Sequence, residues 1–265
     1  MRTTRVRVRR ERPSAMAWAI ALVVTMLVVY FLTLDAARPQ PVERVSAAQR
    51  VTRPVALEAV EGWCVSLCAC DSAEEARVQA SAFTSRGAAG VVSRESGAWH
   101  VLGAAYATCR EAERIAGRLE RDDGISAAVL CVSAEAVNLR VTAPERQIDA
   151  VSDADALLRA QTWQLGDIAL QLDRNEIRPD AARTLCALAA TEARQASKAL
   201  SAVPGAADNA LCAGLIARLD ALRTMLDAVA ADRSAAGAPL SGMLRCAQVE
   251  NLLGLRELQA GLKRE

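Results

Sequence analysis

The stretch WHVLGAAYATCREAE, residues 99–113, decides the fold because a related stretch precedes it in the chain. Shifting the sequence by 36 positions places VSLCACDSAEEA, residues 65–76, on VLGAAYATCREA, residues 101–112. A fixed internal offset indicates that one supersecondary unit occurs twice. Each copy is therefore expected to form a strand, a turn and the opening of a helix.

Both copies carry a helix-start signal at the same place. Ser72 stands three positions before Glu75 in the first copy. Thr108 stands three positions before Glu111 in the second. In this pattern the hydroxyl caps a free backbone N–H group, and the carboxylate reaches back to the cap residue. One such match arises easily by chance, but two in the same register support the repeat.

A helix and a second strand complete the unit behind each cap. Apolar residues recur at helical spacing and predict two buried stripes: Ala76, Ala80 and Phe83, then Ala112, Ile115, Ala116 and Leu119. Gly87 and Gly124 suit the ends of these helices, and the apolar runs at 90–92 and 127–132 suit buried strands. The order βαββαβ over residues 61–134 predicts a four-stranded antiparallel sheet with both helices on one face.

The other face of this sheet is expected to be open. Because side chains alternate along a strand, Val65, Leu67, Val101 and Gly103 are predicted to face the helices. The opposite parity belongs to Cys64, Ser66, Cys68, His100 and Leu102. A sheet face without a second layer needs a ligand or a cover.

The charge of the chain is distributed unevenly. Residues 1–60 hold ten Arg against four acids, residues 61–137 seven against eleven, and the remainder fifteen Lys or Arg against sixteen. Acidic or neutral domains make nucleic acid a poor candidate partner. Aromatic residues make up only 3% of the chain and Ala and Leu dominate, which favours helix.

The N-terminus predicts a membrane anchor. Residues 1–13 hold six arginines, and residues 14–34 form an uncharged stretch of 21 residues. A helix of that length rises about 30 Å, enough to cross a bilayer core, and the arginines mark its cytoplasmic side. A cleaved signal peptide is the alternative, but its apolar core is usually about 7–15 residues long.

Residues 35–60 contain three prolines among polar residues and read as an exposed linker. From residue 140 to 265 the pattern is helical. Four amphipathic segments, separated near Pro179, near Pro204 and before Leu240, predict a helical bundle. Their apolar stripes are expected to form a core, although such a bundle could also recruit a partner or dimerise.

The repeat resembles the SPOR (sporulation-related) domain, on the segments WCVSLCAC and WHVLGAAY and the paired helix starts EEA and REAE. The resemblance covers residues 61–134 and implies a domain that binds peptidoglycan glycan strands across the open sheet face. Carried over by position, the glycan-binding residues would be Ser66, Cys68, His100 and Leu102, with Trp63 and Trp99 as rims that stack on sugars. Ser66 stands where the family often has glutamine, a departure that bears on glycan affinity.

No catalytic constellation emerges from the sequence. His100 is the only histidine and has no nucleophile motif beside it, so an exposed strand residue is favoured over a general base. Eight cysteines lack zinc-ligand spacing. Either they are small buried residues, or a disulfide joins Cys64, Cys68 or Cys70 to Cys131 on the adjoining strand.

These observations predict an α+β protein with a ferredoxin-like or SPOR-type unit between a transmembrane helix and a helical bundle. The expected function is membrane-anchored glycan-strand binding in the cell envelope, linked to division or sporulation, without enzymatic activity, cofactor or metal. The alternative is a structural or interaction protein whose residues 140–265 recruit an envelope partner or dimerise.

Overall fold

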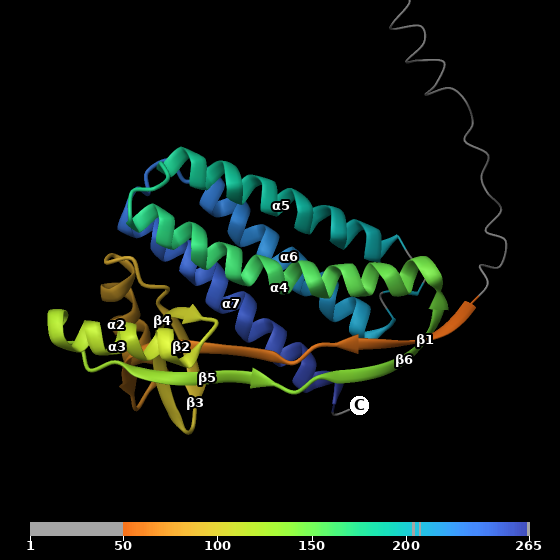
Figure 1. Cartoon of the computed structure of the whole chain (residues 1–265), viewed down its shortest axis with the longest axis horizontal. Coiled ribbons are helices and arrows are strands. Elements are labelled where there is room, and N and C mark those ends of the chain that lie inside the picture. The colour runs from red at the N-terminus through yellow and green to blue at the C-terminus, as the bar shows by residue number, and fades with distance from the viewer. Residues whose placement is uncertain (1–49, 203–204, 207, 264–265) are drawn as a thin grey trace, which may run out of the picture. The chain divides into compact units, whose positions relative to one another are not determined.

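The computed structural model describes residues 50–202, 205–206 and 208–263. The predicted tail at 1–13 and span at 14–34 lie outside these residues. Among the described helices none combines the length and apolar composition needed to cross a bilayer. The described chain is an α+β protein with two antiparallel sheets and six helices, shown in Figure 1.

The repeat folds in the predicted order. The elements are β2 (Val60–Cys70), α2 (Ala73–Thr84), β3 (Val91–Glu95), β4 (Ala98–Tyr106), α3 (Cys109–Asp123) and β5 (Ala128–Ala134). All neighbouring strands are antiparallel, in the order β3-β4-β2-β5. The duplicated strand-helix-strand unit thus forms one four-stranded sheet.

The predicted hydroxyl caps and buried stripes of the two helices are confirmed. The Ser72 hydroxyl accepts the Glu75 backbone N–H at 3.1 Å, and the Thr108 hydroxyl accepts that of Glu111 at 3.3 Å. Gly124 ends α3 in the left-handed conformation, at φ 66°, which glycine adopts without a steric penalty. The buried residues of the two helices are Ala76, Ala80, Ala112 and Ala116. They pack on one face of the sheet in two small clusters.

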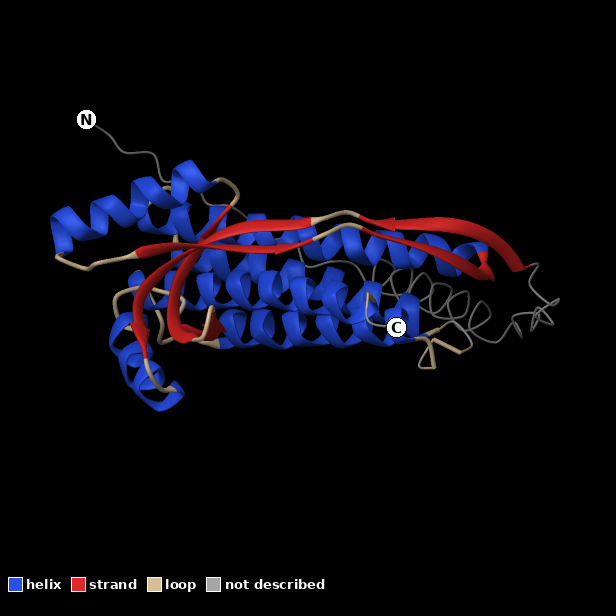
Figure 2. Cartoon of the chain, turned by 90° about the horizontal axis from the view of Figure 1, so that it is seen from below, coloured by secondary structure: helices blue, strands red, loops and turns tan. Residues whose placement is uncertain are grey.

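A two-stranded ribbon extends the structure beyond the repeat. β1 (Arg50–Leu57) pairs with β6 (Val137–Pro144) in antiparallel register. The linker prediction for 35–60 is therefore wrong over 50–57, although Pro54 lies within that stretch. Proline is tolerated because β1 is an edge strand with one neighbour. Val55 and Leu57 anchor it in the core, and Figure 2 shows the ribbon running along the helices.

Four long helices follow, in agreement with the four predicted segments. They are α4 (Glu145–Asp173), α5 (Pro179–Ser201), α6 (Ala210–Ala231) and α7 (Ala238–Leu262). α5 contacts α4 and α6, and α7 also contacts α4 and α6. Their buried leucines form a single hydrophobic core that continues onto the ribbon and onto the sheet.

The main difference from the sequence-based expectation is that the open sheet face is covered. α7 contacts all four strands of the sheet, and α4 contacts β4. The sheet therefore lies between two layers: α2 and α3 on one side, the bundle on the other (Figure 1). Of the two outcomes expected for a bare sheet face, a ligand or a cover, the fold supplies a cover from its own chain.

Two glycines of α7 provide a matched test of how closely α7 is packed on the turn after α2. A Cβ at Gly242 would lie 2.9 Å from the Ala88 backbone oxygen, whereas a Cβ at Gly261 would meet nothing within 4 Å. Gly242→Ala should lower the free energy of unfolding by about 1–3 kcal/mol, because a backbone neighbour cannot move aside. Gly261→Ala should leave it unchanged or raise it by up to about 1 kcal/mol. Urea unfolding of both variants measures this, and equal stabilities would contradict the close approach.

Candidate functional site

The sheet face predicted to bind glycan is the surface on which α7 lies. Gln248 of α7 donates a hydrogen bond to the Ala105 carbonyl of β4 at 3.0 Å. Gly62 of β2 allows a close approach, since a Cβ there would lie 2.7 Å from Leu252 and 3.2 Å from Trp163. Contacts of this kind leave no groove for an extended sugar chain in the described arrangement.

Three of the predicted site residues have the expected parity but are buried. Leu102 is 0% exposed and joins Cys64 in the core shared with the bundle. Ser66 is 1% exposed and His100 9%. The expectation of a solvent-exposed binding face is therefore wrong for these residues. The physical reason lies more than a hundred residues away in the chain, in α7.

Ser66 and His100 form a buried polar pair that the sequence did not predict. Their Oγ and Nδ1 atoms are 3.0 Å apart, and the Ser66 hydroxyl donates to the Cys68 carbonyl at 3.0 Å. A hydroxyl has one proton, so Oγ then accepts a hydrogen bond from Nδ1–H of the imidazole. A catalytic serine needs the opposite direction, in which the imidazole takes the hydroxyl proton. The pair serves to satisfy polar groups under the cover.

Cys68 does not face the bundle side, contrary to the prediction. The pairing of β2 with β4 shifts register between Val65 and Ser66 and again between Ser66 and Cys68. As a result Cys68 stands opposite Val101 and packs with it on the side of α2. A bulge reverses the alternation of side chains beyond it, which a simple count along the strand does not detect.

The two tryptophans also lie on the helix side of the sheet. Trp63 packs with the cluster under α3, and Trp99 with the cluster under α2. The guanidinium carbon of Arg94 lies 5.9 Å from the Trp99 ring centroid, within cation–π range. Neither tryptophan borders the face that holds Ser66, so a sugar-stacking rim around that face is not present.

All eight cysteines are free thiols. Of the two alternatives, the disulfide from Cys64, Cys68 or Cys70 to Cys131 is not formed. Cys131 pairs with Trp63 and so takes the face opposite to Cys64. Cys68 and Cys70 lie closest, with their sulfur atoms 3.9 Å apart. Burial raises the pKa of Cys64 to about 12 and that of Cys186 to about 11. Within the described ranges no three metal-ligating side chains come together.

A salt bridge closes the edge of the covered face. Arg256 of α7 contacts Glu95 of β3 at 2.7 Å, and Glu95 also accepts a hydrogen bond from Ser93 at 2.9 Å. Both charged side chains are mostly buried. Breaking such a pair would leave an unpaired charge at the contact between β3 and α7.

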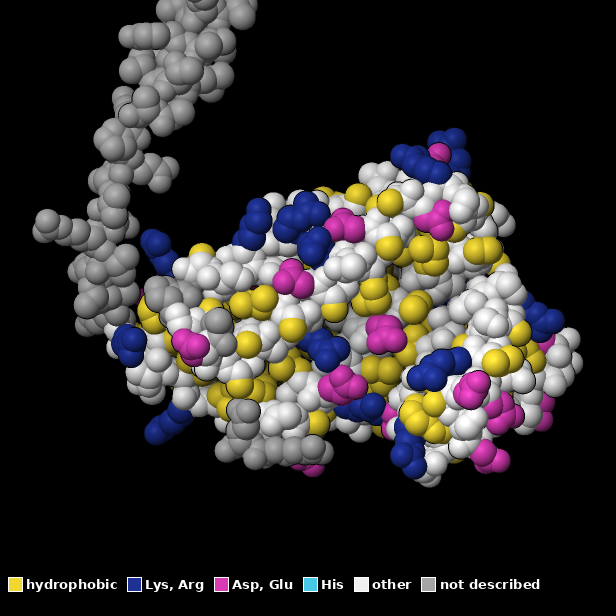
Figure 3. All heavy atoms as spheres, turned by 180° about the vertical axis from the view of Figure 1, so that it is seen from behind, with side chains coloured by type: hydrophobic (Ala, Val, Ile, Leu, Met, Phe, Trp, Pro, Cys, Tyr) yellow, Lys and Arg dark blue, Asp and Glu magenta, His cyan; other side chains and the backbone are white. Residues whose placement is uncertain are grey.

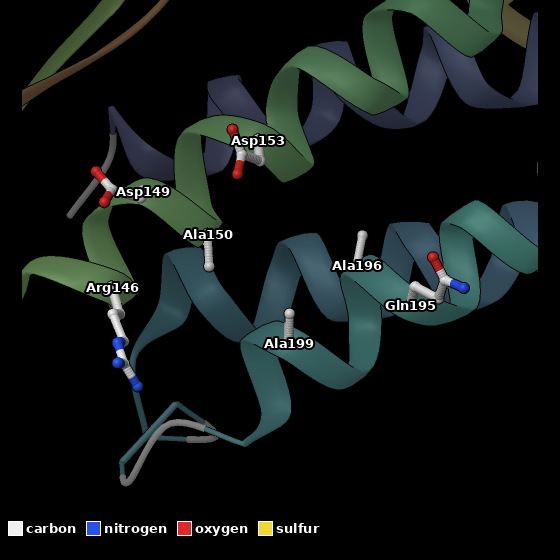
Figure 4. A pocket seen from close by; sticks show the side chains of 7 residues that line it. All are labelled: Arg146, Asp149, Ala150, Asp153, Gln195, Ala196 and Ala199. Atoms are coloured by element: carbon white, nitrogen blue, oxygen red, sulfur yellow. The ribbon is translucent and has the colours of Figure 1, made fainter.

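The free surface of the bundle offers a different candidate site, along α4 and α5. A groove with a volume of about 370 Å³ lies between these helices. Figure 4 shows the side chains that line it. Its lining residues are Arg146, Asp149, Ala150, Asp153, Gln195, Ala196 and Ala199. Three alanines contribute small apolar side chains to the groove, and its charged side chains, of both signs, all belong to α4. The sequence pattern identifies this region only as part of a core-forming stripe.

Exposed apolar side chains concentrate on the same two helices. Within the described residues, four large hydrophobic side chains are exposed, and three of them are Leu170 of α4 and Leu185 and Leu188 of α5. The fourth is Val78 of α2. The back of the molecule, away from α4 and α5 as they lie in Figure 1, also has hydrophobic side chains interspersed with charges of both signs (Figure 3). The groove between α4 and α5 is lined by two aspartates and one arginine, so this surface suits a protein partner better than a polyanion.

Replacing Leu102 tests whether the covered face is core. Leu102→Ser should lower the free energy of unfolding by about 3 kcal/mol or more, since it leaves a cavity and buries a hydroxyl. The control is Val78→Ser, at a side chain that is 65% exposed, which should change stability by no more than about 0.5 kcal/mol. Thermal melting and urea titration give both values. A neutral Leu102→Ser would mean that α7 does not cover this face in solution.

Alkylation of the cysteines tests the packing on both sides of the sheet. Exposed Cys131 should react with iodoacetamide first, and buried Cys64 and Cys186 only after denaturation. Cys68 is partly exposed, but burial first, then its hydrogen bond with Cys70, raise its pKa to about 11. Its alkylation rate should therefore increase about tenfold per pH unit from pH 8 to 10, as the thiolate fraction rises. Peptide mass mapping gives the order, and labelling of Cys64 before Cys131 would contradict the packing.

Comparisons with protein-family models, with curated proteins and with solved structures gave no significant match. The chain has two candidate binding surfaces. The sheet face is covered by α7, and the α4–α5 surface is free.

Proposed function

We propose that this chain is a non-enzymatic interaction protein whose α4–α5 surface binds a protein partner. The observation that carries the proposal is the position of the exposed leucines. Leu188 is 57% exposed, and Leu170 and Leu185 are exposed on the same pair of helices. Solvent-exposed apolar patches that a fold does not use internally are typical of protein interfaces.

In this proposal the SPOR-like unit is the structural base of the bundle. Its helices α2 and α3 seal one sheet face, and α7 seals the other. The bundle helices share one hydrophobic core with the sheet and the ribbon, so they are held in a fixed arrangement. A rigid base of this kind keeps α5 in a defined position for a partner.

The predicted anchor at 14–34 would place the described residues outside the cell membrane, which makes an envelope protein the partner of choice. Residues 35–49 would then separate them from the membrane. Enzymatic activity is not part of this proposal. The one serine–histidine pair supports that reading, because its hydrogen bonds run in the wrong direction for a nucleophile and its serine is buried.

Glycan-strand binding is the second candidate, favoured by the βαββαβ order and by the resemblance of residues 61–134 to the SPOR domain. It requires α7 to leave the sheet. Separation would expose the Ser66–His100 pair, but it would also expose Leu102, Cys64 and the leucines of α7. Since each buried Leu contributes about 1.5–3 kcal/mol, the covered state is strongly preferred.

Photo-crosslinking in the native cell tests the proposed interaction surface. p-Benzoylphenylalanine introduced at Leu188 should give a discrete protein adduct under ultraviolet light, because this side chain is exposed at the centre of α5. The matched control carries the same group at Val78, which is exposed to a similar degree on α2. Adducts from position 188 but not from 78 are expected, and their mass is read from immunoblots.

Equal adducts from both positions would contradict a specific surface on α5, as would none from position 188. Cosedimentation of the full chain with isolated sacculi tests the second candidate in parallel. Under the first proposal the protein stays in the supernatant. Saturable retention that soluble glycan strands compete away would replace that proposal with glycan binding.

A further inference from the structure

The exposed side of α5 is uncharged along three turns. Between residues 181 and 191 the exposed positions are Ala181, Thr184, Leu185, Ala187, Leu188 and Thr191, which we call the α5 patch. The one charged residue in this stretch is Arg183, and it is buried. Its guanidinium donates to the Asp232 carbonyl at 2.9 Å and to the Asp180 carboxylate at 3.0 Å. The only charged side chain between residues 181 and 191 is therefore buried, and the outer side of α5 in this stretch presents apolar and small side chains.

Opposite charges border the α5 patch at equal distances from its centre. Asp180 lies seven positions before Ala187, and Arg194 lies seven positions after it. The fourteen positions between them correspond to about four helical turns, so both side chains emerge on the same side of α5. Both residues are exposed, and so is Glu192, one turn after Leu188, whose carboxylate accepts a hydrogen bond from Gln161 of α4 at 3.0 Å.

We infer that the partner of the α5 patch is a second copy of this chain, bound through α5 about a twofold axis near Ala187. In a twofold contact the same surface is used by both copies, so it must be complementary to itself. Rotation about this axis makes the two helices antiparallel and exchanges positions 180 and 194. Asp180 of each copy then lies beside Arg194 of the second copy, while the uncharged patches face each other.

The charges select this arrangement over the alternative. A parallel pairing in register would bring Asp180 beside Asp180 and Arg194 beside Arg194, and like charges across an interface oppose association. Within one chain Asp180 contacts Arg183 at 3.0 Å and, at the exposed surface, Arg233 at 3.7 Å, and Arg194 contacts Asp227 at 3.3 Å. The Arg194 pair is solvent-exposed and therefore weak, so it leaves the guanidinium able to contact a second copy.

The small area of the α5 patch determines how tightly two copies are expected to bind. Two central leucines with alanine and threonine neighbours cover a small area, in the range of weak protein contacts. We expect a reversible dimer with a dissociation constant of about 1–100 μM. Since it specifies the partner of the surface proposed above, this inference rests on the proposed function.

Sedimentation equilibrium of the full chain in density-matched detergent micelles tests the inference. The protein mass should rise with concentration from 28.1 kDa toward twice that value. Leu188→Glu should weaken dimerisation at least tenfold, because it places two carboxylates at the centre of the contact. The matched control Val78→Glu, on α2, should leave the dissociation constant unchanged. Thermal melting of each variant confirms that it is folded.

A charge exchange tests the antiparallel arrangement. Asp180→Arg and Arg194→Asp should each weaken the dimer about threefold to tenfold, and the double variant should restore it, because the opposite charges again meet. A chain that remains monomeric overturns the inference, as does a dimer that Leu188→Glu does not affect. Loss of the dimer without rescue by the double variant overturns the antiparallel arrangement.

These experiments distinguish failure of the second-copy inference from failure of the proposed function. If the full chain is monomeric while position 188 crosslinks to a different protein, the interaction surface stands and the second-copy inference fails. If the chain dimerises through Leu188 and also binds sacculi saturably, the inference and the α5 interaction surface stand, and only the exclusion of glycan binding fails. If neither a dimer nor an adduct from position 188 is found, both fail.

Discussion

The contact between α7 and the four-stranded sheet is the constraint on which the rest of this structure depends. It is formed where the sheet presents small side chains: Gly62 and Cys64 on β2 and Ala105 on β4. A helix can approach such a surface closely and bury its leucines, and the Gln248 amide satisfies the Ala105 carbonyl there. The bundle, the ribbon and this sheet face consequently share one core. The opposite face, under α2 and α3, holds only two small clusters.

This contact also explains why polar groups occur on the covered face. The Ser66 hydroxyl accepts a hydrogen bond from His100 Nδ1–H at 3.0 Å and donates its single proton to the Cys68 carbonyl at the bulge. The carboxylate of Glu95 is held by Arg256 of α7 and by Ser93. Asn251, further along α7, binds the Leu158 carbonyl and the Thr162 hydroxyl of α4. These hydrogen bonds fix the position of α7 more narrowly than apolar packing alone.

Local signals in the sequence predict the local parts of the fold. The 36-position repeat, the caps at Ser72 and Thr108 and the αL glycine at 124 act over a few residues, and they indicate the βαββαβ order correctly. The ribbon has no clear signal because β1 carries Pro54 and has only two buried side chains, so its periodicity is weak. The bulge at Ser66 has no signal in the sequence, because the register of β2 depends on its partner strand. The covering of the sheet by α7 depends on contacts more than a hundred residues apart, for which a single sequence has no periodic signal.

The same distinction applies to the candidate site. Alternation of side chains along β2 and β4 correctly predicts that Ser66, His100 and Leu102 lie on one face of the sheet. It does not predict whether another element covers that face. Exposure is a property of the whole fold, and the bundle determines it here. Once α7 occupies the sheet, a ligand of that face must compete with the chain itself, whereas α5 has its outer side free. The surface of α5 can bind a partner without unfolding any part of the core, and this difference in free-energy cost is the physical reason to look for function there.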